Sequence, residues 1–145
     1  MRSNRVIQGF VLCSALLVAA GCTICRPVKA EKMNILGSAL TKLSASVEAT
    51  VRYEDPPEGS SDKELLAIAT NHDPGLLAPF SDYTVRVSRQ DGHAIVLICD
   101  NKGKVALLED AGCSSELDQH LWKENPPKRC EFMLDANEVC ASPEE

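Results

Sequence analysis

The sequence predicts an α+β fold in which N-terminal helices pack on a small antiparallel sheet of three to four strands, stapled by disulfide bonds. Three observations support this class: a helical apolar repeat in residues 31–52, two tight turns within residues 84–109, and the cysteines Cys99, Cys113, Cys130 and Cys140 in the second half. A chain of 145 residues holds one domain at most. Its composition, 44% hydrophobic and 25% charged, is typical of a globular protein. We place the domain at residues 32–140.

The first predicted element is a long amphipathic helix over residues 31–52. An isolated helix of this kind is marginally stable in water, so we expect it to pack on the rest of the domain. Its apolar residues recur at spacings of three and four: Met33, Leu36, Leu40, Leu43, Val47 and Val51.

Two shorter helices are predicted next. Prolines and a glycine in residues 55–59 break the chain. Ser61 and Glu64 then form a capping-box pattern, which predicts a second helix that ends near Asn71. Asp73 and Pro74 resemble another helix start, with room for one turn before Pro79.

The sheet is predicted from three strands separated by two turns. Residues 84–89 alternate between apolar and polar side chains, residues 93–99 are almost wholly apolar, and residues 104–109 follow. The turns at 90–92 and 100–103 are short enough for an antiparallel meander. The middle strand is the most apolar, as expected when both faces are covered or one edge is shielded, and the helices cover one face.

The C-terminal part is predicted to add a helix and an edge strand. Ser114 or Ser115 caps a short helix through Trp122, and the prolines at 126 and 127 end it. Residues 131–134 are predicted as a fourth, edge strand. Residues 141–145 form an acidic tail that we expect to be frayed.

The cysteines at positions 99, 113, 130 and 140 are predicted to form two disulfides, for which three pairings exist. Cys99 and Cys113 lie at opposite ends of a predicted strand, some 25–30 Å apart at about 3.3 Å per residue. A disulfide needs Cα atoms within about 7 Å, so this pair is excluded. Cys113 therefore pairs with Cys130 or Cys140, and of these we favour Cys113–Cys130 with Cys99–Cys140. Each bridge contributes roughly 2–4 kcal/mol.

The sequence predicts neither a catalytic site nor a metal or cofactor site. A zinc site built from the cysteines and His120 lacks a close Cys-x₂-Cys or His-x₃-His pair. Ser114 or Ser115 with Asp118 and His120 would lie on one short helix, where they cannot form a nucleophile–base–orienter chain. No glycine-rich phosphate loop is present. The other two histidines, His72 and His93, stand alone among dissimilar neighbours.

The charge distribution argues against a nucleic-acid partner. The formal net charge is −6, whereas phosphate binding requires a basic surface. We expect the acidic residues of the second half to be solvated, although they could also steer a basic partner. These residues are Glu109, Asp110, Glu116, Asp118, Glu124, Glu144 and Glu145.

The N-terminus has the order of a secretory signal. Arg2 and Arg5 precede an apolar segment over residues 6–20, which is shorter than the roughly 20 residues that span a bilayer. The segment ends in Ala19-Ala20-Gly21-Cys22, which resembles the lipobox of bacterial lipoproteins. This family usually has Leu where Ala19 stands here. The resemblance covers the leader only.

The lipobox resemblance implies a location for the mature protein. Residues 1–21 would be a signal peptide, Cys22 the lipidated first residue carrying diacylglyceryl and palmitoyl chains, and residues 22–31 a tether. In this family Asp after the cysteine tends to retain a lipoprotein in the inner membrane. Thr23 at that position implies an outer-membrane anchor facing the periplasm. Two alternatives are cleavage after Ala30 and a Cys22–Cys25 redox or metal pair.

From these features we expect a non-catalytic, lipid-anchored interaction or assembly module of the cell envelope, with an envelope protein as its partner. The alternative is an acidic periplasmic inhibitor or immunity protein that blocks a basic envelope enzyme or toxin. In either role the N-terminal lipid attaches the protein to the membrane, and neither role requires a cofactor.

Overall fold

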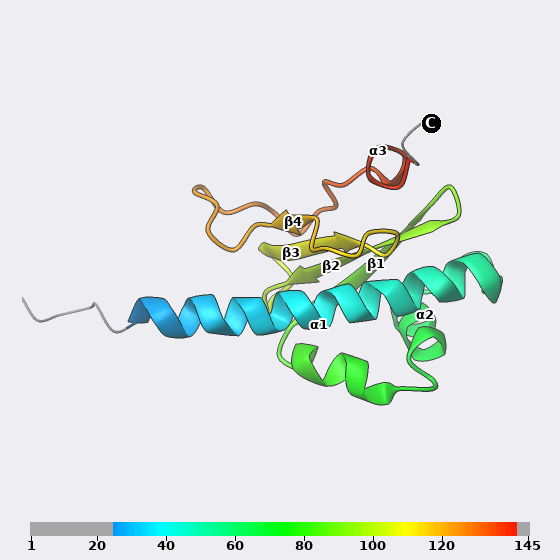
Figure 1. Ribbon diagram of the computed structural model, residues 1–145, viewed down its shortest axis with the longest axis horizontal. Helices are drawn as coiled ribbons and strands as arrows, with labels where there is room; N and C mark the ends of the chain where they lie inside the picture. Colours follow the sequence, from blue (N-terminus) through cyan, green and yellow to red (C-terminus); the bar gives the residue numbers. More distant parts are fainter. Residues whose placement is uncertain (1–24, 142–145) are drawn as a thin grey trace, which may run out of the picture.

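The structure is a computed structural model that describes residues 25–141, and it has the predicted α+β architecture. Helix α1 lies along one face of a four-stranded antiparallel sheet with the strand order β1-β2-β3-β4 (Figure 1). The elements are α1 (Cys25–Tyr53), α2 (Asp62–Ala69), the 3₁₀ helix η1 (Pro74–Phe80), β1 (Thr84–Gln90), β2 (His93–Cys99), β3 (Ala106–Ala111), β4 (Gln119–His120) and α3 (Ala136–Val139).

Helix α1 carries the predicted apolar stripe and buries it. Met33, Leu36, Leu40, Leu43 and Val47 all belong to the main hydrophobic core, which α1 shares with the sheet. The helix begins at Cys25, well before its predicted start, so residues 25–31 of the predicted tether are helical. Cys22 and the predicted signal peptide lie outside the described residues.

The two short helices pack into the same core. The predicted capping box of α2 is confirmed, because the Ser61 side chain accepts a hydrogen bond from the Glu64 backbone N–H while the Glu64 carboxylate accepts one from the Ser61 N–H. At η1 the Asp73 carboxylate accepts a hydrogen bond from the Gly75 N–H, and Phe80 at the other end is buried. Both helices lie below α1 in Figure 1.

Strand β2 is buried on both faces. It pairs with β1 through a two-residue turn at Asp91 and Gly92, both at positive φ, which matches the predicted hairpin. Because strand side chains alternate in direction, Ala94, Val96 and Ile98 join the core under α1. The intervening residues Ile95, Leu97 and Cys99 are covered by the C-terminal part of the chain.

The covering of the second face is a segment with little regular structure, residues 121–140. Leu121, Cys130 and Phe132 pack over Leu97 and Cys99. Nearer the C-terminus, Ala136 at the start of the four-residue helix α3 packs against Ile95 and Ala111. Figure 1 shows this segment on the side of the sheet opposite α1. The domain therefore has three layers: helices, sheet and an irregular C-terminal segment.

Two predicted C-terminal elements are wrong. No helix runs from Ser114 or Ser115 to Trp122, because the Asp118 carboxylate accepts a hydrogen bond from the Ala111 N–H at 2.7 Å and turns the chain back along β3. Residues 119–120 then form β4 beside β3, in the place predicted for an edge strand at 131–134. Residues 133 and 134 instead donate their backbone N–H groups to the carboxylate of Glu109.

The four cysteines form two disulfides, as predicted, but in a different pairing from the one we favoured. The bonds are Cys99–Cys130 and Cys113–Cys140, with Cα separations of 5.7 and 5.6 Å. The exclusion of Cys99–Cys113 is confirmed. The favoured pairing is wrong because the chain returns along β3 after Cys113. This return brings residue 129 opposite Val105, and hence Cys130 to the end of β2, before the chain reaches Cys140.

At Gly112, directly after β3, the backbone packs tightly against α1. A Cβ atom at Gly112 would overlap the backbone carbonyl oxygen of Ser44 and the Cβ of Glu48. We therefore predict that Gly112→Ala lowers the free energy of unfolding by about 3 kcal/mol, because neither backbone can yield without moving α1 off the sheet.

Urea unfolding measures this effect, with Gly37→Ala as the matched control. A Cβ at Gly37 meets only the flexible end of Leu117 at 3.2 Å, and alanine favours the helix, so this variant should stay within about 1 kcal/mol of the parent. Equal stability of the two variants would contradict the packing described for Gly112.

Candidate functional site

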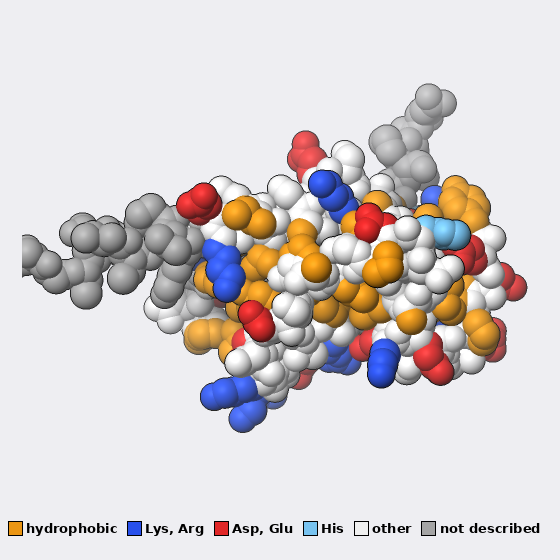
Figure 2. All heavy atoms as spheres, turned by 90° about the horizontal axis from the view of Figure 1, so that it is seen from below, with side chains coloured by type: hydrophobic (Ala, Val, Ile, Leu, Met, Phe, Trp, Pro, Cys, Tyr) orange, Lys and Arg blue, Asp and Glu red, His pale blue; other side chains and the backbone are white. Residues whose placement is uncertain are grey.

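Helices α1 and η1 enclose an open groove of about 1030 Å³. Ile35 and Ala39 of α1 form one wall, and Leu76 and Pro79 of η1 form part of the other. Figure 2 shows the face of the molecule on which α2 and η1 lie, where apolar side chains gather between charged ones. The groove begins at Ala30, close in sequence to the predicted lipidation site at Cys22.

The groove combines an exposed apolar side chain with a polar rim. Ile35 is 60% exposed, because it lies off the stripe that packs Met33 and Leu36 against the core. Glu31 on α1 and Asp73 before η1 also line the groove. Lys42 lines the groove too, so the carboxylates outnumber the basic side chain by one. An apolar surface of this kind is suited to apolar side chains, and the excess of carboxylates favours a basic neighbour. The sequence predicted the helix but gave no signal for this groove, which depends on where η1 packs.

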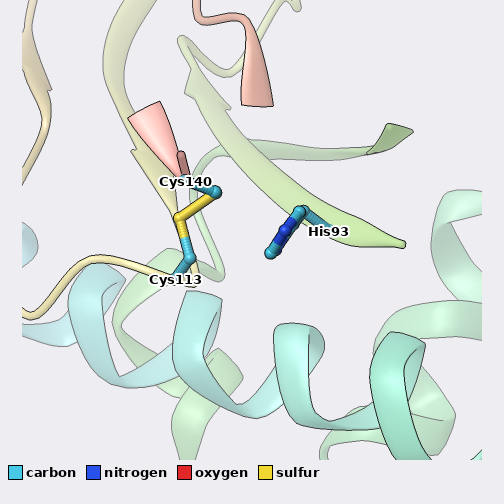
Figure 3. Close-up of side chains that lie close together, drawn as sticks. All are labelled: His93, Cys113 and Cys140. Atoms are coloured by element: carbon cyan, nitrogen blue, oxygen red, sulfur yellow. A yellow bond between two sulfur atoms is a disulfide. The ribbon is translucent and has the colours of Figure 1, made fainter. Parts of the chain in front are cut away.

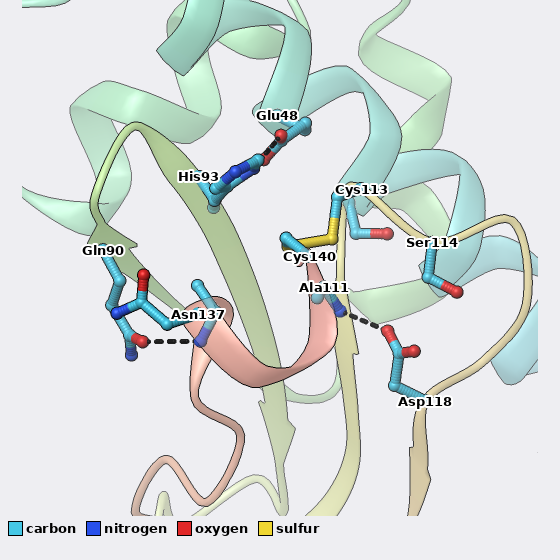
Figure 4. The surroundings of a disulfide bond; sticks show 12 residues. Glu48, Gln90, His93, Ala111, Cys113, Ser114, Asp118, Asn137 and Cys140 are labelled. Atoms are coloured by element: carbon cyan, nitrogen blue, oxygen red, sulfur yellow. Dashed lines mark hydrogen bonds and ion pairs between the residues drawn. A yellow bond between two sulfur atoms is a disulfide. The ribbon is translucent and has the colours of Figure 1, made fainter. Parts of the chain in front are cut away.

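A second cluster of chemically active side chains lies at the other half of α1. The Nδ1 atom of His93 lies 2.6 Å from Oε1 of Glu48, whose Oε2 accepts a hydrogen bond from the Ala94 N–H at 2.6 Å (Figure 4). A ring nitrogen of His93 and the sulfurs of Cys113 and Cys140 lie within 4.8 Å of one another (Figure 3). In the described part of the chain this is the one group placed to hold a metal ion. Its sulfurs are bonded to each other, which leaves no thiolate ligand in this state.

Two acidic residues predicted to be solvated are buried, so that prediction is wrong for Glu109 and Asp110. Strand β3 lies between β2 and β4, and all of its residues except the half-buried Leu107 are buried. Asp110 faces α1, where the Ser44 hydroxyl donates to its carboxylate, and it also accepts from the Asp118 N–H at 3.2 Å. Burial, opposed in part by the Ser44 hydrogen bond, raises the pKa of Asp110 to about 6.

Glu109 faces the C-terminal segment. Its Oε1 accepts hydrogen bonds from the N–H groups of Met133 and Leu134 at 2.9 and 3.1 Å, while its Oε2 is buried without a protein partner. Burial raises the pKa of the Glu109 carboxyl, and the two backbone donors oppose the shift. Glu116 and Glu124 are exposed as predicted. Glu144 and Glu145 lie outside the described residues.

The residues considered for a nucleophile set do not converge. Ser114 accepts a hydrogen bond from the Glu116 N–H, Asp118 is held by Ala111, and His120 contacts the sulfur of Met33.

The cluster around His93 could not be found from sequence, because Glu48 and His93 come from different elements and share no local spacing.

The chain matches no protein-family model, no curated protein and no solved structure. Within residues 25–141, none of the helices is both long enough and apolar enough to cross a bilayer.

The buried position of Asp110 predicts a specific dependence of stability on pH. A carboxyl whose pKa rises from 3.8 to about 6 on folding binds more protons in the folded state. Stability therefore falls as the pH rises from about 4 to 6 and stays lower above that window. Asp110→Asn removes this effect and should increase the free energy of unfolding at pH 7 by about 2 kcal/mol.

Urea unfolding at several pH values between 4 and 7 measures this difference. The stability gained by Asp110→Asn should shrink toward zero at pH 4, whereas the exposed control Glu116→Gln should match the parent throughout. A constant difference at every pH would show that Asp110 is ionised in the folded protein over the whole range.

Proposed function

We propose that this protein is a non-catalytic interaction module of a bacterial cell envelope, anchored through a lipid on Cys22 to the periplasmic face of the outer membrane. In this proposal the groove between α1 and η1 binds another envelope protein. The single observation that carries it is the exposed apolar groove, with Ile35 at its wall, at the part of α1 nearest the anchor.

The groove supports a partner of defined chemistry. Its volume of about 1030 Å³ is at the upper end of pockets that take small ligands, and it is open along α1, so it fits the side chains of one helix face. Two carboxylates, Glu31 and Asp73, and one ammonium group, Lys42, line the groove, so its charge is negative on balance and favours lysine or arginine beside those apolar side chains. We therefore propose an amphipathic helix with a basic flank as the bound segment.

Two features favour binding over the alternative roles. The polar side chains that line the groove are Glu31, Asn34, Ser38, Lys42 and Asp73. Among the described residues no hydrogen bond joins any two of them, so they form no nucleophile–base pair. The inhibitor alternative relied on an acidic face in the second half of the chain. That face is smaller than expected, because Glu109 and Asp110 are buried.

The groove proposal predicts position-dependent contact with one partner. Photo-cross-linking residues at positions 35 and 38 of the full-length anchored protein should capture the same envelope protein in cells, whereas position 49 should not. Ser38 lines the groove, and Ala49 is exposed on the same helix but outside it. The captured protein, purified, should bind Ile35→Lys at least about tenfold more weakly than the parent, with Ala49→Lys unchanged.

Equal capture from position 49, or equal affinity of the two lysine variants, would contradict the assignment of the groove. It would leave the anchor untouched, since that part of the proposal has a separate test.

The anchor proposal predicts the mass and partitioning of the mature chain. Purified from membranes, the protein should begin at Cys22 and carry acyl mass on it, and Cys22→Ser should appear in the soluble fraction. Mass spectrometry of the N-terminal peptide measures this. A mature chain beginning after Ala30, without acyl mass, would overturn the anchor and support ordinary secretion.

A further inference from the structure

The two disulfides lie in different surroundings. Cys99 and Cys130 are buried in the second-face core, where Leu97, Ala106 and Leu121 surround them. Neither Cys113 nor Cys140 is buried, so this bond lies nearer to solvent than Cys99–Cys130 does. Thiol–disulfide exchange requires an incoming thiolate to reach a disulfide sulfur in the native state. Cys113 meets that condition and Cys99 does not.

The imidazole of His93, a group that can donate or accept a proton, lies beside the Cys113–Cys140 disulfide. A ring nitrogen of His93 lies within 4.8 Å of both sulfurs, and the ring stands beside the bond in Figure 3. Glu48 fixes the ring through the 2.6 Å contact with Nδ1, and Glu48 is itself fixed by the Ala94 N–H and flanked by Arg52 at 3.9 Å. Figure 4 shows the carboxylate and the disulfide on either side of His93.

We infer that Cys113–Cys140 is a thiol–disulfide exchange site, attacked at Cys113 by a dithiol protein or small dithiol, with His93 donating a proton through one water molecule to the departing Cys140 sulfur. Glu48 is the positioning residue for His93. This inference goes beyond the proposed groove and does not rest on it.

The exchange step balances as a two-electron reduction. The thiolate of the dithiol bonds to Cys113 Sγ while the Cys113–Cys140 bond breaks, and the electron pair leaves on Cys140 Sγ, which takes a proton from the His93 imidazolium through the water molecule. The second thiol of the dithiol then loses its proton and attacks the first sulfur of the dithiol, which is bonded to Cys113 in the mixed disulfide. Cys113 leaves as a thiolate and is then protonated. The dithiol leaves as a disulfide, and this protein gains two thiols.

The reaction has a structural consequence on the second face of the sheet. Helix α3 is four residues long and buries Ala136 against Ile95 and Ala111. Two side-chain hydrogen bonds to the β1–β2 hairpin also hold it, from Ala136 N–H to Gln90 and from Asn137 to Asp91. Once Cys140 is released, α3 keeps these contacts and the packing of Leu134 and Val139 but has no covalent tie of its own to the sheet, while Cys99–Cys130 still holds the preceding chain.

The first test compares the two disulfides of the unaltered protein. Folded protein is treated with limiting dithiothreitol and alkylated at intervals, and peptide mass spectrometry follows each cysteine. We expect Cys113 and Cys140 to be alkylated at least about tenfold sooner than Cys99 and Cys130. With reduced glutathione, a monothiol, the mixed disulfide should form on Cys113. Equal rates for both bonds, or earlier reaction of Cys99 and Cys130, would overturn the inference.

The second test examines His93. His93→Gln should slow the reaction of dithiothreitol with Cys113–Cys140 by about tenfold, because the leaving sulfur loses its proton donor, whereas the exposed control His72→Gln should react like the parent. The dependence of the rate on pH should also change in His93→Gln, since the part due to an imidazole disappears. Circular dichroism checks that the variant is folded. A folded variant with the parent's rate and pH profile would exclude His93 from the reaction.

Discussion

Strand β2 is the element on which the rest of the structure depends, because it must be covered on both faces. Ala94, Val96 and Ile98 need α1, and Ile95, Leu97 and Cys99 need the C-terminal segment. The two segments that cover β2 differ in their regular structure. Helix α1 satisfies its own backbone and brings a continuous apolar stripe, whereas the C-terminal segment has one four-residue helix. Two disulfides spanning 31 and 27 residues reduce the entropy cost of ordering that segment, by about 3 kcal/mol each.

Buried carboxylates join the three layers at defined points. Glu48 of α1 accepts from the backbone of β2, Asp110 of β3 accepts from the Ser44 hydroxyl of α1, and Glu109 accepts from the backbone of the C-terminal segment. These contacts satisfy donors that would otherwise be buried without partners. The two halves of α1 have different neighbours. Its first half, with the groove, is nearer in sequence to Cys22, and in its second half Glu48 holds His93 beside the Cys113–Cys140 disulfide.

The sequence predicted the elements that local patterns specify: the stripe of α1, the capping box of α2, the hairpin at Asp91-Gly92 and the presence of two disulfides. It could not predict the path after Cys113. That path depends on single long-range contacts, such as the one between Asp118 and Ala111, which carry no periodicity. The pairing of the cysteines and the burial of Glu109 follow from the same path. The groove and the His93 cluster likewise form between elements distant in sequence.

The C-terminal segment, held by the two disulfides, protects the second face of the sheet from solvent. Hydrogen exchange of the backbone amides of Ile95 and Leu97 tests this protection, measured in the native protein and again after the four disulfide-bonded cysteines are reduced and alkylated. We expect these amides to exchange at least roughly a hundredfold faster once both bridges are removed, which corresponds to a loss of protection of about 3 kcal/mol or more. Unchanged protection of Ile95 and Leu97 would show that the segment stays in place without its bridges, and would contradict the account.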